Sequence, residues 1–322
     1  GEAPDRTCQT IGAARMSNRF TEMLNSHDVL LADGATGTNL FNMGLQAGDA
    51  PELWNVDEPK KISALYQGSV DAGSDLFLTN TFGGTAARLK LHSAEKRVRE
   101  LNRIGAELGR EVADKAGRPV AVAGSVGPTG EIMQPVGSLS HALAVEMFHE
   151  QADGLKEGGV DVLMVETIFD TLNAKAALFA INSILLERNA DVPIMISGTI
   201  TDASGRTLSG QTTEAFLNAL SHSPMLSIGF NCALGAEEMK PFVKILSDKA
   251  EAYVSAHPNA GLPNEFGEYD QSPEHMAQML EQFINDGLLN IVGGCCGTTP
   301  EHIAAIAKVA ETATPRKIRV HA

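Results

Sequence analysis

The sequence predicts an α/β protein whose single domain is a closed (β/α)8 barrel, or TIM barrel. Short apolar runs alternate with amphipathic segments along the chain, which is typical of βα units in a parallel sheet. There are eight such runs, the number that a closed barrel requires. The alternative, an open doubly wound sheet, would need a G-x-G-x-x-G turn after the first strand, and residues 33–38 lack that spacing.

The apolar runs are the predicted strands, and amphipathic segments with three- and four-residue spacing are the predicted helices. In chain order the strands are expected at 29–32, 76–79, 120–124, 162–165, 194–197, 226–230, 253–256 and 290–292. The clearest helical segments are 62–72, 142–158, 173–186, 276–286 and 300–310.

The barrel is expected to span residues 21–315, with an N-terminal tail at 1–20 and a C-terminal tail at 316–322. Residues 1–15 lack a periodic apolar pattern, and Met16 resembles a natural start, so the first residues are either a tail or a remnant of cloning.

The charge and apolar patterns exclude several classes of function. The chain has 322 residues, 25 Lys and Arg against 40 Asp and Glu, and a net charge of −15, which disfavours nucleic acid and anionic lipid as partners. No apolar run approaches the roughly 18 to 20 residues of a membrane helix, and no secretory signal is recognisable. We therefore expect a soluble, cytoplasmic protein without nucleic-acid or membrane partners.

Three of the four cysteines are placed to meet at one site; Cys8 lies in the N-terminal segment and is set aside. Cys232 follows the sixth predicted strand, and Cys295 and Cys296 follow the eighth. Loops that follow the strands of a parallel barrel share one face, so the three thiols should converge there. Three thiolates suit Zn²⁺ at about 2.3 Å and leave a fourth position open, as in reactive zinc sites.

Two other interpretations of the cysteines stay open. Adjacent Cys295 and Cys296 could form a vicinal disulfide or a redox pair, or they could be inert buried thiols. A third cysteine at another strand end favours the metal, since neither alternative requires it. The glycines at 293, 294 and 297 would let the backbone turn tightly enough for both side chains to face one ion.

The chemistry that a three-thiolate zinc site favours is ionisation of a substrate thiol, which then acts as a nucleophile. Methyl transfer to sulfur fits this description. Asp33 and Glu166 follow the first and fourth strands and could pair with the ammonium group of an amino acid. The alternatives are that Asp33 only shapes a turn before glycine and that Glu166 is an acid at a helix start.

The blocks at 231–235 and 293–298, Asn-Cys-Ala-Leu-Gly and Gly-Gly-Cys-Cys-Gly-Thr, resemble the zinc motif of homocysteine S-methyltransferases. The resemblance, to the homocysteine-binding zinc barrel that methionine synthases share with other members, spans about residues 30–310. It implies that Cys232, Cys295 and Cys296 bind zinc and that Asp33 and Glu166 hold the homocysteine amine. We also expect the amide oxygen of Asn259 to occupy the fourth zinc position when substrate is away, because a thiolate can displace so weak a ligand; alternatively, Asn259 only shapes its turn.

Other stretches point to different branches of this family. Residues 166–175, 197–211 and 256–263 resemble the homocysteine module of cobalamin-dependent methionine synthase, whereas residues 33–38 are closer to free-standing bacterial enzymes. Gly83 stands where betaine-using animal relatives carry a tyrosine, which argues against betaine as the donor.

We therefore expect a zinc-dependent homocysteine S-methyltransferase, in which homocysteine bound to zinc as a thiolate attacks a donor methyl group and yields methionine. One alternative is a homocysteine-binding module of cobalamin-dependent methionine synthase, without turnover unless a corrinoid protein supplies the methyl group. Another is a thiol-redox protein using Cys295 and Cys296. The donor stays open among methylcobalamin, a sulfonium such as S-methylmethionine, and betaine.

Overall fold

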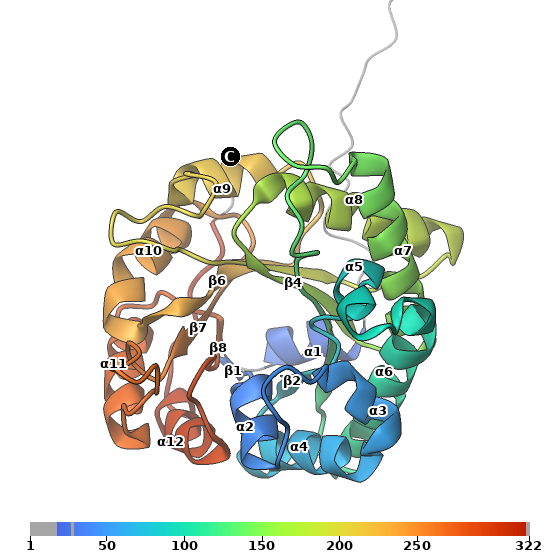
Figure 1. Ribbon diagram of the computed structural model, residues 1–322. Helices are drawn as coiled ribbons and strands as arrows, with labels where there is room; N and C mark the ends of the chain where they lie inside the picture. Colours follow the sequence, from blue (N-terminus) through green and yellow to red (C-terminus); the bar gives the residue numbers. More distant parts are fainter. Residues whose placement is uncertain (1–17, 27–28, 320–322) are drawn as a thin grey trace, which may run out of the picture.

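The computed structural model describes residues 18–26 and 29–319, and the strands among them form a ring of parallel strands surrounded by helices (Figure 1). This confirms the predicted (β/α)8 barrel. The strands are β1 (Leu30–Leu31), β2 (Leu76–Leu78), β3 (Ala121–Val126), β4 (Val162–Ile168), β5 (Ile194–Gly198), β6 (Ser227–Gly235), β7 (Tyr253–Asn259) and β8 (Ile291–Val292).

Most helices lie on the outside of the ring. The helices are α1 (Arg19–Ser26), α2 (Thr36–Asn42), α3 (Trp54–Asp57), α4 (Pro59–Asp71), α5 (Ala86–Leu89), α6 (Val98–Asp114), α7 (His141–Glu157), α8 (Thr171–Glu187), α9 (Thr213–Leu220), α10 (Ala236–Lys249), α11 (Pro273–Asn285) and α12 (Pro300–Ala310), with 3₁₀ turns η1 (Pro51–Leu53), η2 (Lys90–His92) and η3 (Glu95–Arg97). Of these, α7, α8, α9 and α11 begin at a side-chain cap. Side chains of Ser140, Asp170, Thr212 and Ser272 each accept a hydrogen bond from a backbone N–H in the first turn of the helix that follows.

Strand pairing follows the order β1-β8-β7-β6-β5-β4-β3-β2, so the hydrogen-bonded ladder has β1 and β2 at its two ends. Asp75, just before β2, joins these ends. Its backbone N–H donates to the Leu31 carbonyl at 2.7 Å, and its Oδ2 accepts from the Leu31 N–H at 2.8 Å. Further along, Asp33 Oδ2 accepts from the Leu78 N–H at 3.0 Å. Carboxylates therefore complete the ring where the ladder is interrupted.

Three strands run further than the apolar pattern predicts and include predicted site residues in the added length; β3 also runs two residues further, to Val126. β4, β6 and β7 extend into the polar residues that the sequence assigned to loops, so Glu166, Cys232 and Asn259 lie within strands. The apolar pattern stops because these side chains turn toward the polar end of the barrel, but the backbone ladder continues there, for example between Asn231 and His257. The predicted strand ends were therefore wrong at these three places, although the strands themselves were correct.

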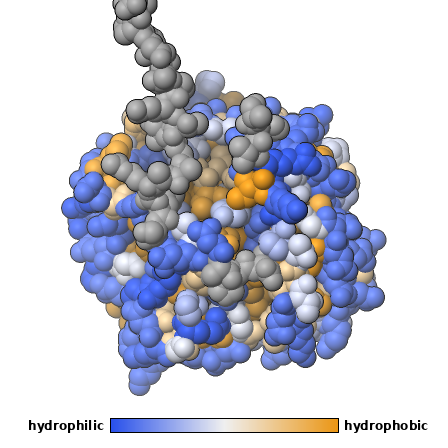
Figure 2. Space-filling view, turned by 180° about the vertical axis from the view of Figure 1, so that it is seen from behind, coloured by the Kyte–Doolittle hydropathy of each residue, from blue (hydrophilic) through white to orange (hydrophobic). Residues whose placement is uncertain are grey.

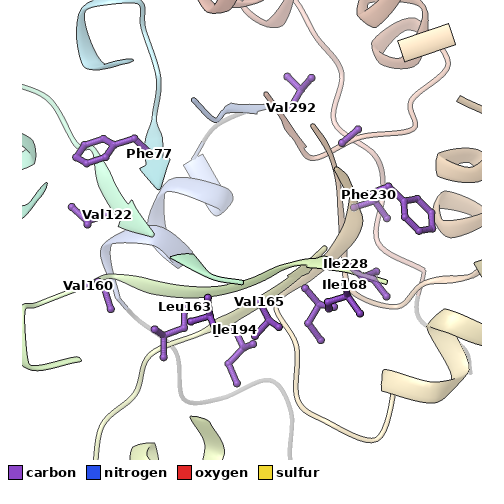
Figure 3. Close-up of a cluster of buried hydrophobic side chains, with 14 of the residues drawn as sticks. Phe77, Val122, Val160, Leu163, Val165, Ile168, Ile194, Ile228, Phe230 and Val292 are labelled. Carbon is purple, nitrogen blue, oxygen red and sulfur yellow. The ribbon is translucent and has the colours of Figure 1, made fainter. Parts of the chain in front are cut away.

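The core has two apolar layers. One lies between the ring and the helices, and Figure 3 shows part of it, including Phe77, Leu163 and Ile228. The other fills the inside of the ring and is lined by strand residues such as Leu76 and Met195. Because all of these side chains are buried, each contributes about 1.5–3 kcal/mol of transfer free energy.

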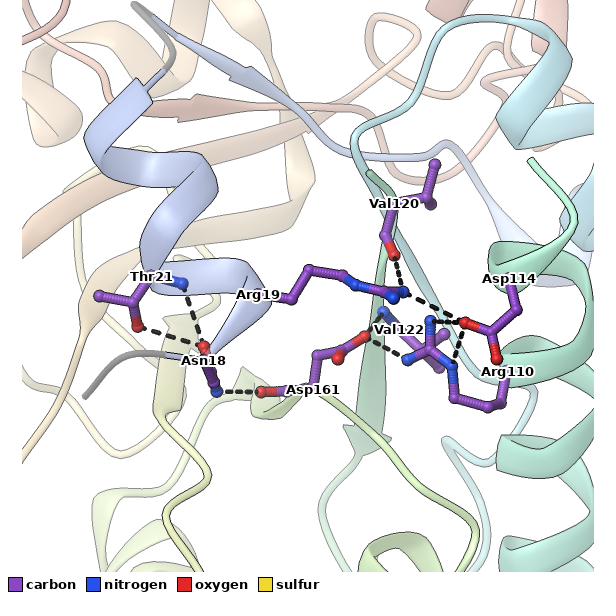
Figure 4. Close-up of polar contacts among 8 residues, drawn as sticks. All are labelled: Asn18, Arg19, Thr21, Arg110, Asp114, Val120, Val122 and Asp161. Atoms are coloured by element: carbon purple, nitrogen blue, oxygen red, sulfur yellow. Dashed lines mark hydrogen bonds and ion pairs between the residues drawn. The ribbon is translucent and has the colours of Figure 1, made fainter. Parts of the chain in front are cut away.

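Helix α1 covers the N-terminal end of the ring. Its residues Phe20, Met23 and Leu24 are buried in the inner apolar layer. Around them, Asn18 donates to the Asp161 carbonyl at 2.8 Å and Arg19 pairs with Asp114 at 3.3 Å (Figure 4). Figure 2, seen from behind Figure 1, shows that described side chains on this face are mostly hydrophilic, with small separated hydrophobic patches.

The residues next to the barrel in the two predicted tails, Phe20 and Arg316, are packed against the barrel. Phe20 is buried at one end, and at the other the buried Arg316 guanidinium donates to the carbonyls of Ser247 and Ala252, each at 2.9 Å. Cys8 and the rest of the predicted remnant, residues 1–15, lie outside the described residues. None of the described helices combines the length and the apolar character that a membrane crossing requires.

Candidate functional site

A cavity of about 350 Å³ opens at the carboxyl end of the ring, where the extended strands β4, β6 and β7 finish. Its floor consists of inward-facing strand residues, and its walls come from the loops after several strands. Among the lining residues are Cys232, Cys295, Cys296 and Glu166. The barrel therefore brings together at one cavity residues that lie far apart in the sequence, as its topology predicts.

The three thiols form a compact cluster, as predicted. Their sulfur atoms all lie within 4.8 Å of one another, and the Cys232 and Cys296 sulfurs are 3.6 Å apart. All three cysteines are free thiols and partly buried. A vicinal disulfide between Cys295 and Cys296 is therefore not the arrangement that the chain adopts.

The spacing of the cluster fits zinc. Thiolates at about 2.3 Å from a tetrahedral ion lie about 3.8 Å from each other, close to the separation of Cys232 and Cys296. Sulfur is a ligand that Zn²⁺ prefers, and three protein ligands leave one position for a further ligand. Oxygen-preferring ions such as Mg²⁺ and Ca²⁺ do not match this donor set.

Cys232 is presented by a bend inside β6. Its φ is +61° and that of Ala233 is +59°, in the left-handed region that side chains other than glycine rarely adopt. The register between β6 and β7 shifts between Asn231 and Gly235, so the ladder is interrupted around the cysteine. The strained bend takes Cys232 out of the regular strand alternation and turns its sulfur toward the other two.

The Cys295–Cys296 segment is fixed from β7 on one side. The Cys295 N–H donates to the Pro258 carbonyl at 2.8 Å, and the Cys296 N–H donates to Asn259 Oδ1 at 3.0 Å. The Ala260 N–H in turn donates to the Cys296 carbonyl at 2.9 Å. These bonds hold both cysteine backbones against the end of the neighbouring strand.

The loop that follows β1 and the first turn of α2 fix the same segment from the other side. Thr38 Oγ1 accepts from the Gly297 N–H at 3.0 Å, and the Thr298 hydroxyl accepts from the Ala35 N–H at 3.0 Å. Gly297 has a φ of +79°, and a Cβ there would lie 2.2 Å from the Cβ of Tyr269. Gly297 is therefore a position in this turn where a side chain would not fit, as the sequence predicted for the glycines around the cysteine pair.

The three thiols are not equivalent before a metal binds. The pKa of Cys232 is strongly lowered because the thiols of Cys295 and Cys296 donate hydrogen bonds to its thiolate. The pKa values of Cys295 and Cys296 are raised because ionising them would remove these donors and add a like charge. The hydrogen bonds within the cluster therefore favour ionisation of Cys232 over that of its two neighbours.

The two predicted substrate carboxylates are buried near each other. The pKa of Asp33 is raised to about 8, mainly by burial and further by the negative charge of Glu166. The hydrogen bond from the Leu78 N–H stabilises the ionised form and partly opposes this increase. Burial also raises the pKa of Glu166 to about 7, with an opposing hydrogen bond from the Ser125 hydroxyl at 2.5 Å. Neither carboxylate has a cationic partner within 4 Å in the described chain. Both are therefore suited to receive one.

Asn259 is fully buried with its amide engaged on one side. Its Oδ1 accepts from the Cys296 N–H, whereas its Nδ2 has no oxygen or nitrogen partner. The Asn259 amide also contributes to lowering the pKa of Cys232 through a side-chain hydrogen bond, so this amide lies at the thiol cluster. In this structure Asn259 therefore positions the cysteine backbone, and its suggested role as a fourth ligand stays a prediction.

Sequence reasoning missed several side chains that organise the site. Ser125 holds Glu166, and Asn231 links three strands, because its Oδ1 accepts from the Ser197 hydroxyl at 2.7 Å and its Nδ2 donates to Thr167 at 2.8 Å. The buried His257 ring lines the cavity, and its Nε2 has no partner. The position of Asn231 directly before Cys232 was the one available signal.

Comparison with known proteins matches most of the chain to one protein family. The family model described as homocysteine S-methyltransferase matches residues 30–310. The metallated form of the homocysteine methyltransferase MmuM from Escherichia coli is 23% identical, covers 90% of this chain and 99% of its own, and has a TM-score of 0.73. The oxidized form of that protein is 23% identical over 91% of this chain and 99% of its own, with a TM-score of 0.74. These structural matches share the barrel fold.

Proposed function

The chain belongs to the homocysteine S-methyltransferase family, and from this premise we propose how its cavity binds the substrate. The homocysteine sulfur lies at Cys232, Cys295 and Cys296, and its ammonium group lies between Asp33 and Glu166. One observation carries the proposal: a cluster of three thiols that fits zinc opens into the same cavity as a buried carboxylate without a counter-ion.

Zinc held by the three cysteines would supply one chemical effect, a lower pKa for a further thiol at the open position. The chain itself contributes a fixed cluster. Hydrogen bonds from the backbone of Cys295 and Cys296 to Pro258 and Asn259 keep the sulfurs in place without substrate. A preformed cluster avoids the entropic cost of assembling the ligands at each turnover.

Asp33 and Glu166 bind and orient the amino acid end of homocysteine. Asp33 accepts from the Leu78 N–H and its own N–H, and Glu166 accepts from the Ser125 and Thr167 hydroxyls. A carboxylate has about four lone-pair sites, so positions remain available to an ammonium. Pairing with a cation lowers both carboxyl pKa values, so binding of the ammonium ionises them. The two ends of homocysteine are then fixed at separate points, which aligns its sulfur.

The methyl transfer needs no acid or base from the chain beyond this. The homocysteine thiol loses its proton to solvent on binding, and its sulfur attacks the donor methyl carbon in line. A sulfur–carbon bond forms while the bond between the methyl group and the donor breaks, and the electron pair leaves with the donor. Methionine is the product, and the cavity contributes alignment and exclusion of water.

Delivery of the methyl group by a corrinoid protein is a second candidate that one observation favours. Loops on the same face as the cavity carry exposed apolar side chains, among them Ile132 and Val136 after β3 and Phe266 after β7. Such side chains could contact a protein that carries methylcobalamin. In this case the chain would bind homocysteine and turn over only with that partner.

One experiment separates these functions. Purified protein is analysed for zinc and free thiols, then incubated with homocysteine and, separately, S-methylmethionine, betaine and methylcobalamin. We expect about one zinc per chain and methionine from at least one donor. Methionine from free methylcobalamin alone would favour the corrinoid-dependent module. A disulfide among the three cysteines, with no zinc and no methionine from any donor, would contradict the proposal.

A further inference from the structure

Asn231 is a buried amide that lies between the two halves of the proposed homocysteine site. Only 2% of its surface is exposed, and it is the last regularly paired residue of β6 before the bend that presents Cys232. Its side chain forms hydrogen bonds to Thr167 at the end of β4 and to Ser197 in β5. Asn231 is thus adjacent in the chain to one functional residue, Cys232, and bonded in space to the neighbour of another, Glu166.

Glu166 and Cys232 are presented by the same kind of backbone irregularity. The β4–β5 register shifts between positions 165 and 168, and the β6–β7 register shifts between positions 231 and 235. Each shift contains a residue in the left-handed region, since the φ of Thr167 is +56° and that of Cys232 is +61°. Both functional side chains therefore depend on strained conformations, which persist only when neighbouring groups hold them.

The Asn231 side chain holds Thr167 in its strained conformation at two atoms. The Thr167 N–H donates to Asn231 Oδ1 at 3.1 Å, and Asn231 Nδ2 donates to Thr167 Oγ1 at 2.8 Å. The Ser197 hydroxyl also donates to Oδ1, at 2.7 Å. Because a backbone N–H can only donate, the atom that faces it is the amide oxygen, and Nδ2 necessarily faces the Thr167 hydroxyl.

This orientation determines where the Thr167 hydroxyl donates. The Nδ2 group offers only hydrogens, so Thr167 Oγ1 accepts from it and keeps its own hydrogen for another acceptor. That acceptor is the Glu166 carboxylate, which receives hydrogen bonds from the Thr167 and Ser125 side chains. A directed chain of hydrogen bonds therefore runs from Asn231 through Thr167 to Glu166, the proposed partner of the substrate ammonium.

The backbone of Asn231 fixes the start of the bend at Cys232. Its carbonyl accepts from Thr199 Oγ1 at 3.1 Å, and its backbone pairs with that of His257 in β7. Beyond Asn231 the pairing with β7 resumes only at Gly235. Because its side chain and its backbone are both held, the bend leaves β6 from a fixed point, and the position of the Cys232 sulfur follows from it.

We propose that Asn231 is the positioning residue that joins the two ends of the homocysteine site: one amide directs the Thr167 hydroxyl onto Glu166 and fixes the bend that carries Cys232. The proposal rests on the proposed function, in which Glu166 binds the substrate ammonium and Cys232 is a zinc ligand. Asn231 acts through these neighbours. It keeps carboxylate and sulfur at a constant separation, so that one homocysteine molecule reaches both without rearrangement of the cavity.

The carboxylate end is tested at Thr167. Thr167→Val replaces the hydroxyl by a methyl group of similar size and removes the donor to Glu166, whereas Thr167→Ser keeps the hydroxyl. Calorimetry on the zinc-loaded protein should show at least tenfold weaker homocysteine binding for Thr167→Val, because a hydrogen bond to a charged group is lost. Thr167→Ser should stay within about threefold of wild type.

The thiol end is tested with Co²⁺, which accepts the same tetrahedral set of sulfur ligands and reports on it through its sulfur-to-cobalt absorption bands. Asn231→Ala releases both bends, so it should weaken Co²⁺ binding and homocysteine binding at least tenfold each. Thr167→Val should leave the Co²⁺ affinity and spectrum unchanged, since it breaks only the chain to Glu166.

Asn290→Ala is the matched control for loss of a buried amide. Asn290 is 4% exposed and lies just before β8, at the opposite end of the barrel. Its Oδ1 accepts from the Val254 N–H at 3.0 Å, and its Nδ2 donates to the Arg316 carbonyl at 2.8 Å. Asn290→Ala and Asn231→Ala should lower the melting temperature of the metal-free protein similarly, but only Asn231→Ala should weaken Co²⁺ and homocysteine binding.

Failure of this inference is distinguishable from failure of the proposed function. If wild type binds zinc and homocysteine but Thr167→Val binds homocysteine as well as Thr167→Ser does, the chain to Glu166 has no positioning role. If Asn231→Ala affects both ligands no more than Asn290→Ala does, the amide is merely structural. In either case the inference is wrong and the methyltransferase stands. If wild type binds neither zinc nor homocysteine, the proposed function fails and this inference fails with it.

Discussion

The two ends of the barrel are built from the same strands but have opposite chemistry. At the N-terminal end, α1 inserts Phe20 and Met23 into the apolar interior, and its polar contacts lie in the rim. At the carboxyl end, the cavity contains buried carboxylates and thiols, with Glu166 lacking a positive partner among the described residues. Burial of apolar side chains at the N-terminal end thus stabilises the fold. The buried carboxylates at the other end have an unfavourable electrostatic energy, which a bound cationic ligand can offset.

This difference indicates that stability and function are divided between the ends. Strained backbone also gathers at the carboxyl end, where Thr167, Cys232 and Ala233 have positive φ. Such conformations persist when the surrounding structure fixes them, and here the amide of Asn231 and the β6–β7 ladder do so. Substitutions at the two ends should therefore change different measurable properties.

The largest effect is expected from Cys296→Ala, which removes one of three sulfurs from the cluster. Zinc affinity and methionine formation should each fall at least a hundredfold, since zinc sites distribute about 10–16 kcal/mol over their ligands. The far-ultraviolet circular dichroism and the melting temperature should match those of zinc-stripped wild type. Full activity in the zinc-free variant would refute the division between the ends.

At the opposite end, Phe20→Ala should lower the free energy of unfolding by about 3–5 kcal/mol, because it leaves a cavity in the inner apolar layer. Urea denaturation measures the loss. The homocysteine KM should stay within about twofold of wild type, and a large change in KM with unaltered stability would contradict the comparison. Phe179→Ala makes the same truncation at a side chain that is 61% exposed and should cost little.

Glu166→Gln should have opposite effects on stability and on binding. In the zinc-free, substrate-free protein the Glu166 pKa is raised from 4.5 to about 7, mainly by burial. Between these pH values the folded chain retains a proton that the unfolded chain has lost, so wild-type stability falls as pH rises. The variant should equal wild type at pH 4 and exceed it by up to about 3 kcal/mol at pH 8.

The same variant should bind homocysteine at least tenfold more weakly at pH 8, because the ammonium loses a charged partner. Chemical denaturation at both pH values and the homocysteine KM provide the two measurements. A variant that is less stable than wild type at pH 8 would show that Glu166 is a structural ion and not a binding group.

The smallest effect is expected from Arg19→Ala at the rim of the N-terminal end. Its ion pair with Asp114 spans 3.3 Å between side chains that are 41% and 53% exposed, and such pairs contribute about 0–1 kcal/mol. Thermal melting should show a shift near the limit of detection. A decrease in the free energy of unfolding above about 2 kcal/mol would mean that polar contacts, and not the buried face of α1, hold this helix on the barrel.

The sequence predicts the ring of strands well because each buried strand leaves a short apolar run. It predicts strand ends poorly where the ladder continues into polar residues, as at Glu166 and Cys232. Helix α1 was missed although Phe20, Met23 and Leu24 have the i, i+3, i+4 spacing of a helix. A segment of eight residues is a weak signal, and its burial depends on the open end of the finished barrel.

The thiol cluster could be predicted because cysteine is rare and the barrel topology fixes where strand ends meet. The role of Ser125 could not be predicted, since serine is common and its role depends on the side chain of Glu166 from the neighbouring strand. The roles of Asp33 and Asn259 stay predictions, although both are buried beside the elements that carry the cluster.

The interruption of the ladder between β1 and β2 should respond to ligand binding in the cavity. Asp33 closes this joint through its bond with the Leu78 N–H, and the same carboxylate is the proposed partner of the substrate ammonium. An ionised Asp33 is a stronger acceptor than a protonated one, so binding of an amino acid should tighten the joint. Deuterium uptake at the Leu78 amide should then slow when homocysteine enters, although the ligand never touches that amide.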